Sequence, residues 1–271
     1  MRASAPAKLN LALVVGPVRD DGKHEVVTVY QRLGIADRID LDEASSLRID
    51  GFADDTLVRG ALEALAARAG VEPRWHVRIG KRLPVAAGVG GGSSDAAAAL
   101  RLANGTLAVP LPPEVLHELA AGLGADVPFF LADGPQLGSG DGSALAPLDL
   151  PQDFWVLLLL PSGGRKPSTR DIYDAFDRRG GAAGWEERRA ALLAALERVR
   201  RPRDLAALPP NDLASSPLAG ELVALGAFRA DVTGAGPAVY GLFHHERAAE
   251  AAQRALKRAG RTWLTAPAWY G

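Results

Sequence analysis

The chain has 271 residues, a length that fits one large domain or two modest ones and excludes a miniprotein that needs disulfides or metals to fold. Hydrophobic residues make up 48%, charged residues 23% and cysteines none, which indicates a folded globular protein without disulfides, thiolate nucleophiles or cysteine-based metal sites. The 31 Lys and Arg balance the 32 Asp and Glu, so a net charge of −1 gives no general attraction for nucleic acid or an anionic membrane.

The amino-terminal apolar run is too short for a secretion signal. The longest aliphatic run, at 154–161, is far below the roughly 18 residues typical of a membrane span. We therefore expect a cytosolic protein with neither a membrane nor a nucleic acid as partner.

The first half of the chain begins with strands. Apolar alternation predicts strands at 5–15 and 26–33 that pair as a hairpin through a long loop. Two short strands, an amphipathic helix and another strand follow, at 37–43, 47–50, 55–70 and 75–79. A glycine-rich loop then leads into an Ala/Leu helix that Ser or Asp would cap, and a further helix is expected at 112–124.

The second half has an α+β pattern. A Gly/Ser/Pro-rich stretch at 134–151 favours a seam near residue 150, which divides the chain into domains 1–150 and 151–271. Residues 178–184 are expected to form a flexible linker. The predicted strands are 154–160, 228–232, 238–243 and 262–266, and the predicted helices are 168–178, 185–200, 217–226 and 246–259.

The loop from Pro84 to Asp95 is the most informative stretch. Its glycines allow close backbone approach to a ligand, and the helix that follows adds the positive end of its dipole, a combination suited to phosphate. A Walker loop is excluded because Ser93, not Lys, follows the last glycine, and the dinucleotide fingerprint lacks its third glycine or alanine. The alternative is a flexible linker with a helix cap.

A second glycine-rich turn, Thr233 to Pro237, lies between two predicted strands. Its amides and the Thr233 hydroxyl would suit an anion, although a tight hairpin explains the glycines equally well.

Two charged residues stand in apolar surroundings. Lys8 and Asn10 share one face of the first strand, and a lysine inside an apolar strand needs a partner or ligand unless it lies at a solvated edge. Asp126 lies among apolar residues, where pairing with a lysine would offset its burial; the alternative is a helix cap or turn aspartate.

Three segments occur in the order typical of the GHMP small-molecule kinases: PAKLNLAL, PVAAGVGGGSSDAAA and VTGAGPAVYG. The chain resembles this family over about residues 5–245. The segments DDGKHEVVTVYQRLGIADRI, GADVPFFL, STRDIYDAF and NDLASSP resemble its 4-diphosphocytidyl-2-C-methyl-D-erythritol kinases, which act in the non-mevalonate isoprenoid pathway.

The resemblance implies a two-domain α+β fold. The amino-terminal half would be like ribosomal protein S5 domain 2 and the carboxyl-terminal half ferredoxin-like, with the active site in the cleft between them. It also implies that ATP lies with its phosphates on the glycine-rich loop. The residues matched to nucleotide binding are Lys81, Pro84, Val85, Ala86, Ala87, Gly88, Val89, Gly90, Gly91, Gly92, Ser93 and Ser94.

The same matching assigns the catalytic roles. Lys8 would offset charge at the reacting centre, and Asp126 would take the proton from the 2-hydroxyl of the substrate. Asn10 would orient that hydroxyl or its neighbours. The turn residues matched to the substrate diphosphate region are Thr233, Gly234 and Gly236.

The cytosine subsite is matched to His24, which would hydrogen-bond the base edge, and Tyr173, which would stack on the base. Alternatively, His24 is an ordinary loop residue and Tyr173 an ordinary core residue, with no role in binding. Lys23 stands where the family usually has Tyr, so an aliphatic stem and a charge would lie over the base or against a phosphate. Thr56 stands where the family often has an Asn near adenine.

The expected function is therefore ATP- and Mg²⁺-dependent phosphorylation of the 2-hydroxyl of 4-diphosphocytidyl-2-C-methyl-D-erythritol. The alternatives are another GHMP kinase, acting on mevalonate, homoserine or a sugar, and a nucleotide-binding module without catalysis. No Asp/Glu cluster identifies the Mg²⁺ ligands, so Ser94 or the ATP phosphates alone would suffice. Both a monomer and a homodimer fit the sequence.

Overall fold

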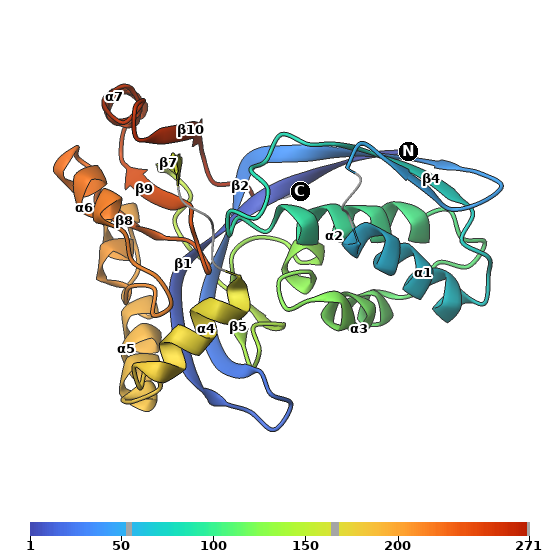
Figure 1. Cartoon of the computed structure of the whole chain (residues 1–271), viewed down its shortest axis with the longest axis horizontal. Helices are drawn as coiled ribbons and strands as arrows, with labels where there is room; N and C mark the ends of the chain where they lie inside the picture. Colours follow the sequence, from blue (N-terminus) through green and yellow to red (C-terminus); the bar gives the residue numbers. More distant parts are fainter. Residues whose placement is uncertain (53–55, 164–167, 270–271) are drawn as a thin grey trace.

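A computed structural model describes residues 1–52, 56–163 and 168–269. It has the expected α+β architecture, with two antiparallel-rich sheets and helices packed against them (Figure 1). None of the helices in these ranges is long and apolar enough to cross a membrane.

The first sheet is built on one long hairpin. Its strand order is β3-β4-β2-β5-β6, and β1 pairs with β2 outside that path. The strands are β1 (Arg2–Val18), β2 (His24–Glu43), β3 (Arg48–Asp50), β4 (Trp75–Gly80), β5 (Gln136–Ser139) and β6 (Ala144–Pro147). The two strands expected at 26–33 and 37–43 are one strand, because β2 stays paired with β1 through both and irregularities in register absorb the intervening residues.

Helices cover one face of this sheet (Figure 1). They are α1 (Leu57–Ala69), α2 (Gly91–Asn104), α3 (Pro113–Leu123) and the 3₁₀ turn η1 (Pro128–Leu131). Small alanines of α2 and aromatic residues of η1 share a buried cluster with strand residues such as Ile39 and Val77. This packing fixes the start of α2 and the segment before η1, which both carry predicted site residues.

The second sheet has the order β10-β7-β9-β8 and is entirely antiparallel. Its strands are β7 (Trp155–Pro161), β8 (Arg229–Val232), β9 (Val239–Phe243) and β10 (Gly260–Thr265). The helical elements of this half are α4 (Thr169–Arg178), α5 (Trp185–Leu196), η2 (Pro202–Ala207), α6 (Pro217–Ala224) and α7 (Glu246–Ala255).

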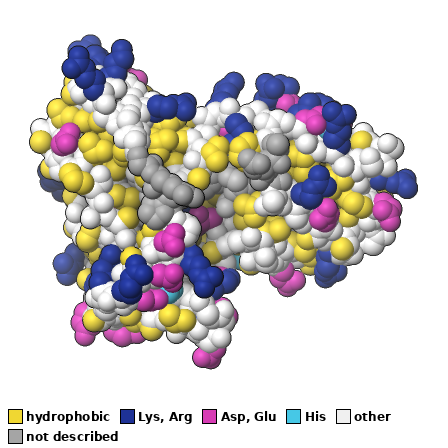
Figure 2. All heavy atoms as spheres, in the orientation of Figure 1, with side chains coloured by type: hydrophobic (Ala, Val, Ile, Leu, Met, Phe, Trp, Pro, Cys, Tyr) yellow, Lys and Arg dark blue, Asp and Glu magenta, His cyan; other side chains and the backbone are white. Residues whose placement is uncertain are grey.

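Helix α4 is strongly amphipathic. A capping box between Ser168 and Asp171 begins it, and its charged side chains are exposed, in the region where Figure 2 shows Lys, Arg, Asp and Glu gathered. Ile172, Tyr173 and Phe176 face inward against residues of β1 and β2.

The expected linker at 178–184 is a set of tight turns instead. Gly181 lies against the Phe176 ring, and the Arg188 guanidinium donates to the carbonyls of Gly181 at 2.8 Å and Val15 at 3.0 Å. Polar, glycine-rich composition indicated flexibility, but the arginine from α5 ties this stretch to β1.

The two halves share a continuous core. One buried cluster contains Leu9 and Leu11 of β1 together with Leu158 of β7 and Tyr240 of β9. Every strand up to Pro147 belongs to the first sheet and every strand from Trp155 to the second. The division into domains 1–150 and 151–271 stays a prediction, because the shared core couples the two sheets.

Candidate active site

A cavity of about 700 Å³ lies where β1, the glycine-rich loop at 84–95, α4 and the Thr233–Pro237 turn meet. It collects predicted site residues that are far apart in the sequence. The predicted residues that line it are Lys8, Asn10, Lys23, His24, Gly88, Ser93, Asp126, Tyr173 and Gly234.

Lys8 and Asp126 form an ion pair in the wall of this cavity. The Lys8 Nζ lies 3.1 Å from Asp126 Oδ2 and donates to Asn10 Oδ1 at 2.6 Å. The Lys8 side chain is 3% exposed, whereas that of Asp126 is 34% exposed. A buried ammonium is tolerated only with such partners. The pair therefore presents a fixed positive charge and a partly open carboxylate to the same cavity.

Tyr30 completes this centre, and the sequence did not predict it. Its hydroxyl donates to Asp126 Oδ1 at 3.0 Å, and its ring stacks on Phe129 with a centroid distance of 4.9 Å. Burial, with the neighbouring Asp126 charge, raises the pKa of Tyr30 well above its ordinary value, so it remains a donor. The early signals were the predicted hairpin, whose pairing sets Tyr30 opposite Asn10, and the place of Tyr30 in the family-like segment at 20–39; neither assigned it a role.

The glycine-rich loop has the geometry of an anion cradle. Ala86, Gly88 and Gly90 have positive φ angles at every second position, an alternation that turns successive amides to one side. A Cβ on Gly88 would lie 2.3 Å from the Thr233 carbonyl oxygen, so this position requires glycine. The loop thus packs directly on the second glycine-rich turn.

Helix α2 begins earlier than the sequence suggested. Its N-cap is Gly90 in a left-handed conformation, and no Ser or Asp side chain caps it. The helix therefore starts at Gly91, which places Ser93 and Ser94 in its first turn. The Ser94 amide donates to the Gly90 carbonyl at 2.8 Å, whereas the Ser93 amide precedes this first helical hydrogen bond. The expected cap at Ser or Asp is wrong because Gly90 supplies the turn through its backbone conformation alone.

The Thr233–Gly236 turn contacts the same centre. The Thr233 hydroxyl, fully buried, accepts a hydrogen bond from the Asn10 backbone amide at 3.1 Å. A Cβ on Gly234 would lie 3.5 Å from Lys8 Nζ. The three segments that carry the family resemblance therefore meet around Lys8. Gly234 lines the cavity, whereas the Thr233 hydroxyl is engaged within the protein.

Lys81 does not line the cavity. Its Nζ donates to Asp37 Oδ2 at 2.6 Å and Asp95 Oδ2 at 2.8 Å, and both carboxylates are fully buried. Asp37 Oδ1 also accepts the Leu83 amide at 2.8 Å, at the start of the loop. Burial lowers the Lys81 pKa, but the two hydrogen-bonded carboxylates outweigh it and leave the pKa raised. Contact of Lys81 with adenine stays a prediction, beside its evident role of joining β2, the loop and α2.

Replacing Lys81 by Met is expected to destabilise the protein by on the order of 3 kcal/mol, because two buried carboxylates lose their cation. It should also weaken ATP binding, since the loop loses an anchor. Chemical denaturation and nucleotide titration measure both effects. Lys257→Met, at an exposed position, is the control, and adding Asp95→Asn to Lys81→Met should restore part of the stability. Unchanged stability of Lys81→Met would contradict the anchoring role.

His24 and Tyr173 lie together at the other end of the cavity. Their ring centroids are 4.8 Å apart, and His24 Nε2 is 2.8 Å from Asp177 Oδ1. Burial, chiefly, raises the pKa of Tyr173 to about 12. Lys23 Nζ lies 2.5 Å from Asp141 Oδ2, and despite desolvation this contact and those from Ser143 lower the Asp141 pKa to about 2. Two aromatic faces and an ion pair thus bound this end.

The described residues include no group of three His, Cys, Asp or Glu side chains able to hold a metal ion. The Ser94 hydroxyl is buried without a hydrogen-bond partner in the described part of the chain. Mg²⁺ commonly binds through one or two protein ligands together with substrate phosphates and water. This Ser94 hydroxyl, next to the glycine-rich loop, therefore fits an Mg²⁺ ion that binds together with the phosphates of ATP.

Residues 56–134 match the family model of the GHMP kinases N terminal domain, and residues 213–262 match that of the GHMP kinases C terminal. A protein of an Anaeromyxobacter species, named 4-diphosphocytidyl-2-C-methyl-D-erythritol kinase, is 37% identical over 94% of this chain and 86% of its own length. The chain belongs to the GHMP kinase family. A Geobacter sulfurreducens protein of the same name is 34% identical over 97% of this chain and 96% of its own length.

Solved GHMP kinases have the same fold. The crystal structure of a 4-(cytidine 5'-diphospho)-2C-methyl-D-erythritol kinase superposes with a TM-score of 0.79 and 31% identity, covering 98% of this chain and 99% of that one. A homoserine kinase from Cytophaga hutchinsonii superposes with a TM-score of 0.74 and 15% identity, covering 100% of this chain and 96% of that one. At this identity the likeness shows only a common fold.

Proposed function

We propose that this chain is a 4-diphosphocytidyl-2-C-methyl-D-erythritol kinase, which transfers the γ-phosphoryl group of ATP to the 2-hydroxyl of its substrate and releases ADP. The relatives of that name support the substrate over nearly the whole chain. The observation that carries the chemistry is the Lys8–Asp126 ion pair, which faces the cavity beside the glycine-rich loop. The enzyme would act in the non-mevalonate isoprenoid pathway.

Asp126 accepts the proton of the attacking hydroxyl. Its Oδ2 is held by Lys8 and its Oδ1 by Tyr30, so the carboxylate has one orientation while a third of its side-chain surface stays open. In phosphoryl transfer the bond to the leaving group is largely broken in the transition state, so a weak, well-placed base suffices. The proton moves to the carboxylate as the new oxygen–phosphorus bond forms.

Lys8 stabilises the charge that spreads over the transferred group. Its ammonium is desolvated and fixed by Asn10 and Asp126, so no reorganisation is needed as the negative charge develops. The loop amides and the amino-terminal end of α2 bind the remaining phosphates. Mg²⁺, bound with ATP and reached by Ser94, would neutralise phosphate charge.

The cytosine of the substrate lies at the His24 end of the cavity. His24, oriented by Asp177, contacts the base edge, and Tyr173 offers a ring face. Lys23 stands beside this subsite with its charge directed to Asp141, so its aliphatic stem is available for contact with the base.

Replacing Tyr173 by Ala is expected to raise KM for the cytidylyl substrate by roughly 10- to 100-fold, because loss of base stacking costs about 1–3 kcal/mol. ATP binding should not change. Steady-state kinetics with each substrate varied in turn measures this. Phe176→Ala serves as the comparison, since Phe176 belongs to the same helix and packs in the core without lining the cavity. An unchanged KM in Tyr173→Ala would assign the ring to the core.

The proposed activity is tested by ADP release from the purified protein with Mg²⁺-ATP and four acceptors in parallel. These are 4-diphosphocytidyl-2-C-methyl-D-erythritol, mevalonate, homoserine and a hexose. Release with the cytidylyl substrate alone is expected. Turnover with another alcohol instead would overturn the substrate while leaving the roles of Lys8 and Asp126, and nucleotide binding without turnover would reduce the chain to a binding module.

A further inference from the structure

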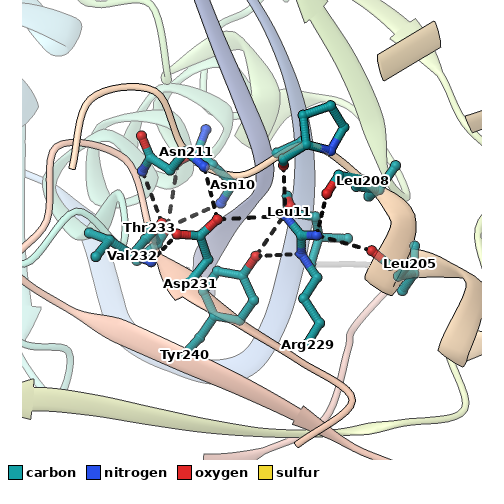
Figure 3. A network of polar contacts seen from close by, with 12 residues as sticks. Asn10, Leu11, Leu205, Leu208, Asn211, Arg229, Asp231, Val232, Thr233 and Tyr240 are labelled. Atoms are coloured by element: carbon teal, nitrogen blue, oxygen red, sulfur yellow. Dashed lines mark hydrogen bonds and ion pairs between the residues drawn. The ribbon is translucent and has the colours of Figure 1, made fainter. Parts of the chain in front are cut away.

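A buried polar network lies behind the Thr233–Gly236 turn and reaches Asn10 through Thr233 (Figure 3). Its members beyond Thr233 have no role in the chemistry above. At its centre is Asn211, in the segment between η2 and α6, with 8% of its surface exposed. Its Nδ2 donates to the carbonyl oxygens of Val232 at 2.9 Å and Gly234 at 2.7 Å. Its Oδ1 accepts the Leu213 amide at 2.8 Å. The side chain therefore bridges the two carbonyls that flank Thr233.

The bridged turn lies directly against the reacting centre. The Thr233 hydroxyl accepts the Asn10 amide, and Gly234 approaches Lys8 Nζ closely enough that an added Cβ would lie 3.5 Å from it. Gly234 and Gly236 both have positive φ angles. Glycines give such a turn little stiffness of its own, so its position depends on what holds it from outside.

Asn211 is itself firmly anchored. Its backbone amide donates to Asp231 Oδ2 at 2.9 Å, and the next residue, Asp212, donates its amide to the Leu13 carbonyl of β1 at 2.9 Å. Arg229, 7% exposed, donates to the carbonyls of Pro209 at 2.9 Å and Leu208 at 2.6 Å. The anchors come from β8 and β1, the same strands that carry the turn and Lys8.

Satisfied buried networks of this kind hold one arrangement, because any alternative leaves a polar group without a partner. Here the arrangement sets how far the turn stands from β1. Chemical steps depend steeply on such spacing, and a displacement near 1 Å can cost about 100-fold in rate.

We propose that Asn211 is a positioning residue for phosphoryl transfer: its side-chain amide fixes the Thr233–Gly234 turn against Lys8 and Asn10. It acts through the turn and touches no reacting atom. The inference rests on the proposed kinase function for its kinetic consequence, whereas the effect on the turn is independent of it.

The test is Asn211→Asp, which turns both donors into acceptors facing carbonyl oxygens. The matched control is Asn104→Asp, because Asn104 is also 8% exposed and bridges backbone groups of Leu111, outside the cavity lining. At a temperature where all variants are folded, kcat of Asn211→Asp should fall at least about ten-fold, with KM for ATP changing less. A loss no larger than in the Asn104 variant overturns the proposal. Asn211→Ala and Asn104→Ala decide by the same criterion if the aspartate variant fails to fold.

Hydrogen exchange provides a readout without turnover. The amides of 232–238 should exchange faster in either Asn211 variant than in the wild type, and not in the Asn104 variants. Unchanged protection overturns the positioning role whatever the kinetics. If the wild type itself phosphorylates no cytidylyl substrate, the proposed function fails, and the exchange result still decides whether Asn211 holds the turn.

Discussion

Replacement of Asp126 by Asn is expected to lower kcat by roughly 10²- to 10⁴-fold, the range that a positioned general base contributes. The amide keeps the shape of the carboxylate: its one oxygen can still accept a hydrogen bond from Lys8, and its NH2 group can donate to the Tyr30 hydroxyl once that hydroxyl rotates. It cannot take a proton. The loss should therefore fall on turnover, while calorimetric titration shows ATP binding close to that of the wild type.

The control for this prediction is Asp133→Asn. Asp133 follows on the same segment, is exposed and does not line the cavity, so it undergoes the same change in charge outside the site. Its kcat should equal that of the wild type. If Asp126→Asn retained a near-normal kcat at equal thermal stability, the carboxylate would only orient Lys8, and the base would have to be found elsewhere.

Much of the reacting centre was predictable from local pattern. Lys8 and Asn10 share a face because side chains two apart in a strand point the same way. A lone charge in PAKLNLAL and another in GADVPFFL each needed a partner, and they are partners of one another. Strand periodicity and the cost of burying a charge narrowed the choices, but they left a solvated strand edge open for Lys8 and a cap or turn open for Asp126; the family resemblance assigned the two roles.

The residues that the sequence did not reveal act through contacts between distant segments. Tyr30 is 96 positions from Asp126 in the chain. Its neighbours in the sequence are those of an ordinary core tyrosine in a strand. Asn211 begins the segment NDLASSP, which carries part of the family resemblance, but its role was not predicted because its partners are on β8 and the turn after it. Lys81 was matched to the nucleotide, but Asp37 and Asp95, which hold it, come from β2 and α2. Only tertiary packing determines such partners.

The errors in the predicted elements have local causes. The β2 strand continues through residues 34–36, where the sequence predicted a break between two strands, because pairing with β1 outweighs their weak strand propensity. Helix α2 begins at a glycine because the left-handed conformation of Gly90 starts it where no side chain signals a cap. The stretch 178–184 is ordered by Arg188, which lies outside it. In each case the element is decided by a contact or a backbone conformation that the pattern of neighbouring residues does not reveal.

Replacement of Lys8 by Met is expected to lower kcat by roughly 10²- to 10³-fold, as removal of a preorganised charge donor from a reacting centre does. Met fills much of the same volume, so the apolar neighbours of β1 stay packed. The ammonium acts on charge that develops during transfer, so KM for ATP should change less than kcat. Steady-state and single-turnover kinetics separate the two. A raised KM with normal kcat would make Lys8 a binder of the ground state.

The double variant, Lys8→Met with Asp126→Asn, tests whether the pair works as a unit. Each single change removes one member of an ion pair whose atoms are 3.1 Å apart, so each also disturbs the residue left behind. Residues that act together on one step show losses far from additive, and removing the second adds little once the first is gone. The double variant should therefore be about as slow as the slower single variant. Losses that multiplied would show that Lys8 and Asp126 contribute to transfer independently, with Lys8 serving the phosphates and Asp126 the hydroxyl.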